Sequence, residues 1–126
     1  MRTVSIEGAP TPVGHYSHAV EANGFLFLSG VLPTSPLPGE QDDFERQVRA
    51  TLAQCERVLQ AAGYRLADVV QCTAYIVDVA HWPQFNAVYA EVLGNHRPAR
   101  TVVPVAELHH GWLTEIQLVA HRGHDA

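Results

Sequence analysis

The architecture is set by Ala19-Val20-Glu21-Ala22-Asn23-Gly24-Phe25-Leu26-Phe27-Leu28-Ser29, in which two apolar runs flank an Asn-Gly pair. Both central residues of a type I′ turn need a positive φ, which Asn and Gly adopt readily. The stretch therefore predicts a β-hairpin with strands at residues 19–22 and 25–29. A short strand is predicted just before it, at Val4-Ser5-Ile6.

Beyond the hairpin, a proline-rich loop at residues 33–39 leads into a predicted helix from Asp43 to Ala62. Asp43 lies at the positive end of the helix dipole, and Gly63 supplies the stop. The apolar residues of the helix recur at steps of three and four and form one face. They are Phe44, Val48, Leu52, Cys55, Val58, Leu59 and Ala62.

The second half of the chain repeats this alternation of strand and helix. Residues 69–77 form a nearly continuous β-branched and apolar run, typical of a strand covered on both faces. A second helix is predicted from Trp82 to Leu93, where Pro83 fits the first turn because its missing N–H has no intrahelical partner there. Strands at about residues 100–105 and 113–121 complete the chain.

The predicted order βββαβαββ indicates an α+β fold, a mixed sheet with two helices that most simply cover one face. The 126 residues suffice for a single domain, residues 1–126. The opposite face of the sheet needs a cover as well, so we expect an oligomer.

Composition and charge exclude several classes of protein. Thirteen acidic residues against eight basic ones give a net charge of −5, and every basic residue is Arg. A nucleic-acid binder needs a basic face, so the balance argues against that partner while leaving room for a local basic pocket. No apolar run approaches the roughly 18 residues of a membrane span, and the N-terminus has no apolar signal region. We therefore expect a cytoplasmic protein with no membrane partner.

Neither a metal nor a cofactor is predicted. Cys55 and Cys72 lack the spacing of a thiolate zinc site and are expected to be buried free thiols. The eight His residues include no pair with metal-binding spacing, and His121 and His124 lie near the C-terminus. No nucleophile elbow or phosphate loop occurs. Ser29 alone is most simply a strand-end residue that bonds the backbone.

Two charged residues stand in unusual places. Arg100 follows Pro98-Ala99 at the start of a predicted strand, where a guanidinium can hold a carboxylate through two parallel hydrogen bonds. Glu115 lies mid-strand, where an isolated carboxylate is costly to bury without a partner or a role. On these grounds alone, a structural salt bridge or a solvated sheet face is favoured over a site for this pair.

A set of short blocks nevertheless resembles the Rid family (RidA, also called YjgF), the reactive intermediate deaminases. The resemblance covers nearly the whole chain, and the combination of blocks is specific although each is weak alone. The blocks are Pro12-Val13-Gly14-His15-Tyr16-Ser17-His18-Ala19-Val20, Phe27-Leu28-Ser29-Gly30, Ala61-Ala62-Gly63, Phe85-Asn86-Ala87-Val88-Tyr89, Pro98-Ala99-Arg100-Thr101 and Glu115-Ile116.

The resemblance implies a chorismate-mutase-like fold, a homotrimer with active sites between subunits, and metal-free hydrolysis of enamines and imines. The substrates would be of the 2-aminoacrylate and 2-iminopropanoate type, converted to 2-keto acids and ammonia. Arg100 would bind the substrate carboxylate, and Glu115 would position or activate the attacking water. The resemblance also implies that Tyr16, Ser29, Gly30 and Asn86 line the pocket.

Two other functions remain open: a non-catalytic relative that binds small carboxylates in the same pocket, and an endoribonuclease or translation inhibitor. The sequence departs from residues common in the family at Val31, Val102 and Gln117, which bears on which substrate fits.

Overall fold

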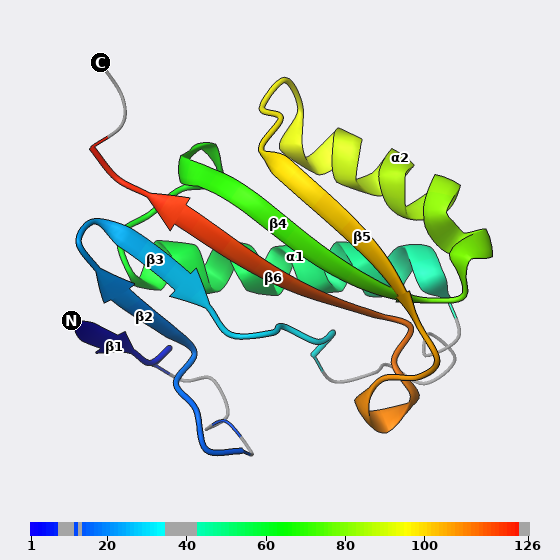
Figure 1. Ribbon diagram of the computed structural model, residues 1–126, viewed down its shortest axis with the longest axis horizontal. Helices are drawn as coiled ribbons and strands as arrows, with labels where there is room; N and C mark the ends of the chain where they lie inside the picture. The colour runs from blue at the N-terminus through cyan, green and yellow to red at the C-terminus, as the bar shows by residue number, and fades with distance from the viewer. Residues whose placement is uncertain (8–11, 13, 35–42, 124–126) are drawn as a thin grey trace.

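The computed structural model describes residues 1–7, 12, 14–34 and 43–123 (Figure 1). A six-stranded mixed sheet has the order β1-β2-β3-β6-β4-β5, in which β4 and β5 are parallel and the other neighbours antiparallel. The strands are β1 (Arg2–Val4), β2 (Ala19–Ala22), β3 (Phe25–Leu28), β4 (Val69–Val77), β5 (Ala99–Val105) and β6 (Thr114–His121). The helices are α1 (Phe44–Ala61) and α2 (Trp82–Leu93). Short 3₁₀ turns, which the sequence pattern does not predict, are η1 (Leu66–Asp68), η2 (Val79–His81) and η3 (His109–Gly111).

The predicted α+β fold and its βββαβαββ order are confirmed. At the predicted hairpin, Asn23 and Gly24 have φ values of 54° and 80°, as a type I′ turn requires. The first strand, predicted at residues 4–6, instead spans Arg2–Val4, because β1 pairs with β2 in the register that sets Arg2 opposite Glu21. Most of the predicted proline-rich loop, residues 35–39, lies outside the described residues, as does His124.

Helix α1 follows the predicted pattern closely. The Asp43 carboxylate caps its first turn by accepting a hydrogen bond from the Arg46 N–H. At its end Gly63 has a φ of +85°, and the Tyr64 N–H donates to the Leu59 carbonyl at 2.8 Å, the six-to-one bond of a Schellman motif. The predicted apolar face is buried throughout.

Both helices pack on the same face of the sheet, and their buried residues join the inward side chains of the strands in one core. In β4 these are Val69, Cys72, Ala74 and Ile76. The thiols of Cys55 and Cys72 are free and buried, as predicted. No helix in the described part of the chain is long and apolar enough to cross a membrane.

The other face of the sheet is open in a single chain. Phe25 and Phe27 on β3 are 39% and 46% exposed, and Val70 on β4 is 38% exposed. The helices of one chain cover only one face of β4, so the predicted cover of its second face would have to come from another copy of the chain. Exposed aromatic and branched side chains on a sheet face are typical of a surface that another protein covers.

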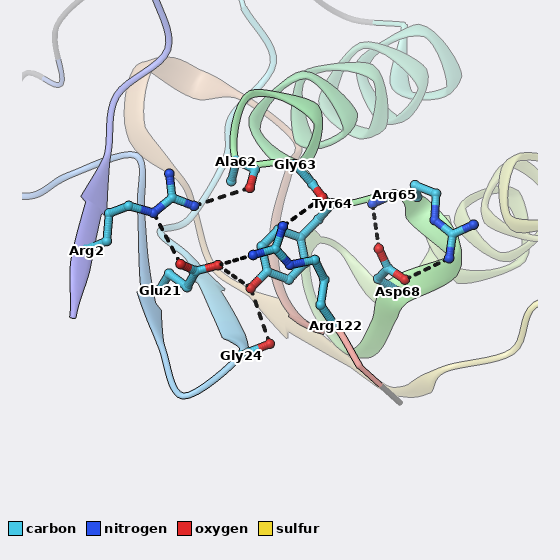
Figure 2. Close-up of polar contacts among 9 residues, drawn as sticks. All are labelled: Arg2, Glu21, Gly24, Ala62, Gly63, Tyr64, Arg65, Asp68 and Arg122. Carbon is cyan, nitrogen blue, oxygen red and sulfur yellow. Dashed lines mark hydrogen bonds and ion pairs between the residues drawn. The ribbon is translucent and has the colours of Figure 1, made fainter. Parts of the chain in front are cut away.

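A polar cluster ties the chain ends to the rest of the sheet (Figure 2). The Glu21 carboxylate accepts hydrogen bonds from Arg2 at 3.2 Å, Tyr64 at 2.6 Å and Arg122 at 3.2 Å. Arg122 also lies over the Tyr64 ring, 4.6 Å from its centroid. The hydrogen bond from Tyr64, then that from Arg2, lowers the pKa of Glu21. Glu21 thus joins β2 to the first strand, to the turn that follows α1 and to the residue that follows β6.

Candidate functional site

Arg100 lies on the edge strand β5, and the register fixes the face that it occupies. It pairs with Cys72, whose side chain points into the core, so Arg100 also projects to the helix side of the sheet. Its Nη1 donates to Asn86 Oδ1 on α2 at 2.9 Å. Among the described residues no carboxylate pairs with it, which leaves the other guanidinium N–H groups for an external anion.

Aromatic rings from α2 surround the Arg100 guanidinium. Its Cζ lies 4.9 Å from the centroid of Tyr89, 5.8 Å from that of Trp82 and 6.0 Å from that of Phe85. These residues recur at helical spacing and therefore share one side of α2. We call Trp82, Phe85 and Tyr89 the aromatic shelf. The shelf and Asn86 restrict the orientation of Arg100 at the wall of a pocket of about 480 Å³.

Glu115 occupies a different environment. It pairs with Tyr75 across β4 and β6, so it projects to the open face of the sheet, while Ile116 on the next position is buried. Its carboxylate makes no hydrogen bond or ion pair with any described residue. Burial raises the pKa of the Glu115 carboxyl, and the nearby His109 opposes part of that effect. A half-buried carboxylate of this kind is suited to accept a proton from water.

The chain bends around Glu115 at Ser29-Gly30. Phe27 pairs with Val119, but Val31 bridges to Ile116, so one extra residue is inserted in the strand between these pairs. Such a bulge re-aims the neighbouring side chains. A Cβ at Gly30 would collide with the Glu115 carboxylate. Gly30 is therefore required for the observed position of that carboxylate.

Tyr16, Ser29 and Gly30 line a second pocket of about 240 Å³. The Ser29 hydroxyl donates to the Ser17 carbonyl at 2.6 Å, the backbone role expected of a strand-end serine. His18 lines the same pocket, and its Nδ1 accepts the Ile6 N–H at 3.1 Å. That bond requires His18 to carry its proton on Nε2.

The predicted site residues therefore fall into two groups in a single chain. Asn86 and Arg100 border the larger pocket on the helix side of β5. Tyr16, Ser29 and Gly30 border the smaller pocket, and Glu115 lies beside Gly30 on the open face. One chain does not bring Arg100 and Glu115 into one cavity. An acid–base centre that uses both must take them from different copies of the chain.

Several residues at these pockets were not singled out in the sequence. The sequence places Trp82 and Tyr89 on the second predicted helix, where their spacing from Asn86 on one helical face was visible. His18 and Arg97 offered no local signal, because only the fold brings them to a pocket. Within residues 1–7, 12, 14–34 and 43–123, no three His, Cys, Asp or Glu residues gather as a metal site.

Of the positions that depart from the family pattern, Val31 is buried against Ile116, and Gln117 is exposed on the open face. Val102 lies two residues beyond Arg100 on the same face and packs against the core. The wall next to Arg100 is therefore apolar at this point.

Known proteins resemble the chain over almost its full length. Residues 6–122 match the family model described as Endoribonuclease L-PSP. A RutC family protein from Pyrococcus horikoshii is 41% identical, over 92% of this chain and 94% of its own. The 2-iminobutanoate/2-iminopropanoate deaminase of Escherichia coli K12 is 31% identical, over 96% of this chain and 98% of its own.

The fold agrees with these sequences. The crystal structure of RidA from the Antarctic bacterium Psychrobacter has a TM-score of 0.87 and 30% identity, covering 96% of this chain and 99% of that one. The matched family model and the likeness in sequence extend over the strands and helices that carry Arg100 and Glu115. The chain belongs to the YjgF/RidA family.

Proposed function

We propose that this protein hydrolyses reactive enamine and imine intermediates of the 2-aminoacrylate and 2-iminopropanoate type to 2-oxo acids and ammonia. The observation that carries this proposal is the Arg100 guanidinium, which lies at a pocket wall with no carboxylate partner among the described residues. A substrate of this class has one carboxylate next to the reacting carbon, so an anchored carboxylate also fixes that carbon.

We place the reacting site between two copies of the chain, in a homotrimer. One copy would supply Arg100 and Asn86, and its neighbour would supply Glu115 with Tyr16, Ser29 and Gly30. Two observations support this arrangement: Arg100 and Glu115 face different sides of one sheet, and the open face exposes Phe25, Phe27 and Val70. A closed cyclic assembly repeats one such contact at every interface.

The proposed chemistry needs only a held water and proton transfer. Glu115 accepts a proton as the water oxygen bonds to C2 of the imine, and the electron pair of the C=N bond moves to nitrogen. The carboxyl returns this proton to nitrogen, which gives a carbinolamine with a hydroxyl and an amino group on C2. It then transfers the proton of the C2 hydroxyl to the amino group as the C–N bond breaks, so that ammonia leaves and the C2 carbonyl forms. Nothing is oxidised or reduced. The raised pKa of Glu115 favours this exchange, because a weaker acid holds the proton more readily.

The decisive test is kinetic. A threonine dehydratase generates 2-iminobutanoate in place, and semicarbazide captures whatever imine is not hydrolysed. The wild-type protein should suppress capture, and Arg100→Ala should not. Arg46→Ala is the matched control, since Arg46 is exposed on α1 and lines neither pocket. Failure of the folded wild-type protein to suppress capture of any imine in a panel would overturn the proposal.

The main alternative is a binding protein that takes small carboxylates without turnover, favoured by the split of Arg100 and Glu115 within one chain. It predicts Arg100-dependent binding of 2-oxobutanoate with no suppression of capture. The matched family model is described as Endoribonuclease L-PSP, so RNA cleavage is the second alternative to test. The net charge of −5 and the absence of Lys argue against RNA as a ligand, and a salt-sensitive RNA-binding assay would decide this.

A further inference from the structure

The pocket beside Arg100 carries a second guanidinium. Arg97 and Arg100 line the same cavity of about 480 Å³ and are separated by Pro98 and Ala99. No Asp or Glu is among the described residues that line it. Two positive charges without a carboxylate on the wall make this pocket favourable for an anion with more than one charged group.

These two arginines differ from most of the others in the chain. Arg2, Arg46, Arg49, Arg65 and Arg122 each form an ion pair with a carboxylate. Arg97 makes no hydrogen bond or ion pair with a described residue. In a chain with thirteen acidic and eight basic residues, two guanidiniums at one pocket with no carboxylate partner among the described residues indicate a binding site for an external anion.

The backbone on which Arg97 lies is anchored. Gly94, with a φ of +62°, ends α2, and its N–H donates to the Ala90 carbonyl at 2.9 Å. In the next turn the His96 N–H donates a hydrogen bond to the Leu93 carbonyl at 3.2 Å. The Nε2 atom of His96 forms a second hydrogen bond, with the Val69 carbonyl, at 2.7 Å. The loop is thus tied to both α2 and β4. Its position beside Arg100 does not have to be created when a ligand binds.

The size of the pocket also favours a ligand with more than one charged group. Its volume lies in the range of sites that hold complete ligands much larger than a short imino acid. A monocarboxylate bound to Arg100 by its single charged group leaves the Arg97 part of the pocket unused. A longer substrate has a second carboxylate for that part of the pocket.

We propose that the preferred substrates are 2-imino dicarboxylates, the imines of acidic amino acids, with the carboxylate next to C2 on Arg100 and the distal carboxylate on Arg97. This rests on the hydrolysis proposed above and alters none of its bonds. Water adds to C2 and ammonia leaves as before, while the distal carboxylate only binds. Arg97 is then a specificity-determining residue.

Stable 2-oxo acids separate binding from turnover. Calorimetric titrations compare 2-oxoglutarate, which has two carboxylates, with 2-oxobutanoate, which has one. We expect the wild-type protein to bind 2-oxoglutarate about tenfold more tightly, and Arg97→Gln to remove that preference. Arg97→Lys should retain part of it, because the charge remains while the planar fork is lost. Arg46→Gln makes the same charge change away from the pocket and should leave the preference intact.

The same variants are then assayed for suppression of semicarbazide capture, with 2-iminoglutarate supplied by an oxidase that acts on glutamate and 2-iminobutanoate by a dehydratase. The ratio of kcat/KM for the two imines should fall about tenfold in Arg97→Gln. An unchanged ratio, or the absence of any preference for 2-oxoglutarate in the wild-type protein, overturns the assignment of Arg97. Failure of the hydrolysis proposal looks different, because neither imine is then consumed whatever residue occupies position 97.

Discussion

Arg100 and Glu115 project from opposite faces of one sheet, although their strands flank the same neighbour. On β4, Arg100 pairs with Cys72, which points toward the helices, and Glu115 pairs with Tyr75, which points away from them. Successive residues of a strand face opposite sides of the sheet. Cys72 and Tyr75 are three positions apart on β4, so their partners Arg100 and Glu115 also lie on opposite faces. A site that uses both residues must therefore be assembled from more than one chain.

This relationship predicts complementation between two inactive variants. Arg100→Ala and Glu115→Gln are each expected to lose activity, yet co-expressed in equal amounts they should form mixed assemblies that regain it. In a cyclic trimer that contains both variants, about one third of the interfaces combine an intact Arg100 with an intact Glu115. The measurement is imine hydrolysis by mixed assemblies purified through two different tags. No recovery in verified mixed assemblies would contradict a site between copies.

Gly30→Ala should abolish activity with little loss of fold. The new Cβ would meet the Glu115 carboxylate, which is the far end of a flexible side chain and can move aside. Displacing a catalytic carboxylate by about 1 Å can cost roughly 100-fold in rate. The check is kcat/KM together with thermal unfolding. An active Gly30→Ala variant would show that the observed position of Glu115 is not required.

The pH dependence should report on Glu115. Because burial raises its pKa, the carboxylate is destabilised in the folded state, and activity should fall as the pH drops through that raised value. Glu115→Gln is expected to lower kcat by about 10²–10⁴-fold and to remove this acidic limb.

The same shift has a consequence for stability. At pH values between the pKa of Glu115 in the unfolded state and its raised pKa in the folded state, the Glu115 carboxyl binds its proton more fully in the folded protein. The wild-type protein therefore loses stability relative to Glu115→Gln as the pH rises. The variant should therefore be the more stable protein at neutral pH and lose that advantage in acid. Chemical denaturation at several pH values measures both trends.

The aromatic shelf predicts different effects of two changes at Tyr89. Its hydroxyl is buried beside the Cys72 thiol, which is a weak hydrogen-bond partner, so Tyr89→Phe should change stability by less than about 1 kcal/mol. Tyr89→Leu removes the ring beneath Arg100 and should raise KM more than it lowers kcat. Equal KM values in the two variants, both folded, would show that the ring does not position Arg100.

The cluster around Glu21 predicts a purely structural effect. Tyr64→Phe deletes the hydroxyl that donates to Glu21 and should cost about 1–2 kcal/mol of unfolding free energy without altering imine hydrolysis. The lowered pKa of Glu21 means that stability from the cluster is present above the ordinary carboxyl range and is lost as the pH falls through the folded value. The destabilisation by Tyr64→Phe should accordingly shrink in acid, which urea titrations at pH 7 and pH 3 will reveal.

Local sequence was sufficient for the elements themselves. The Asn23-Gly24 pair, the apolar face of α1 and its stop at Gly63 depend on backbone preference and side-chain spacing within a few residues. The alternation along β6 likewise separated Glu115 from the buried Ile116. By contrast, the first strand was misplaced by two residues, because its bounds depend on pairing with β2 rather than on its own pattern.

The face taken by Arg100 was not visible in the sequence. Apolar residues at Val102, Val103 and Val105 lie on both sides of β5, so no alternation marks its buried side. Only the parallel register with β4 places Arg100 against the aromatic shelf and brings Arg97 to the same pocket. Residue types and their spacing therefore determined which elements form, and which residues can carry the chemistry. Long-range strand pairing alone decided which of those residues meet, because the faces and neighbours of a strand depend on its partners and not on its own residues.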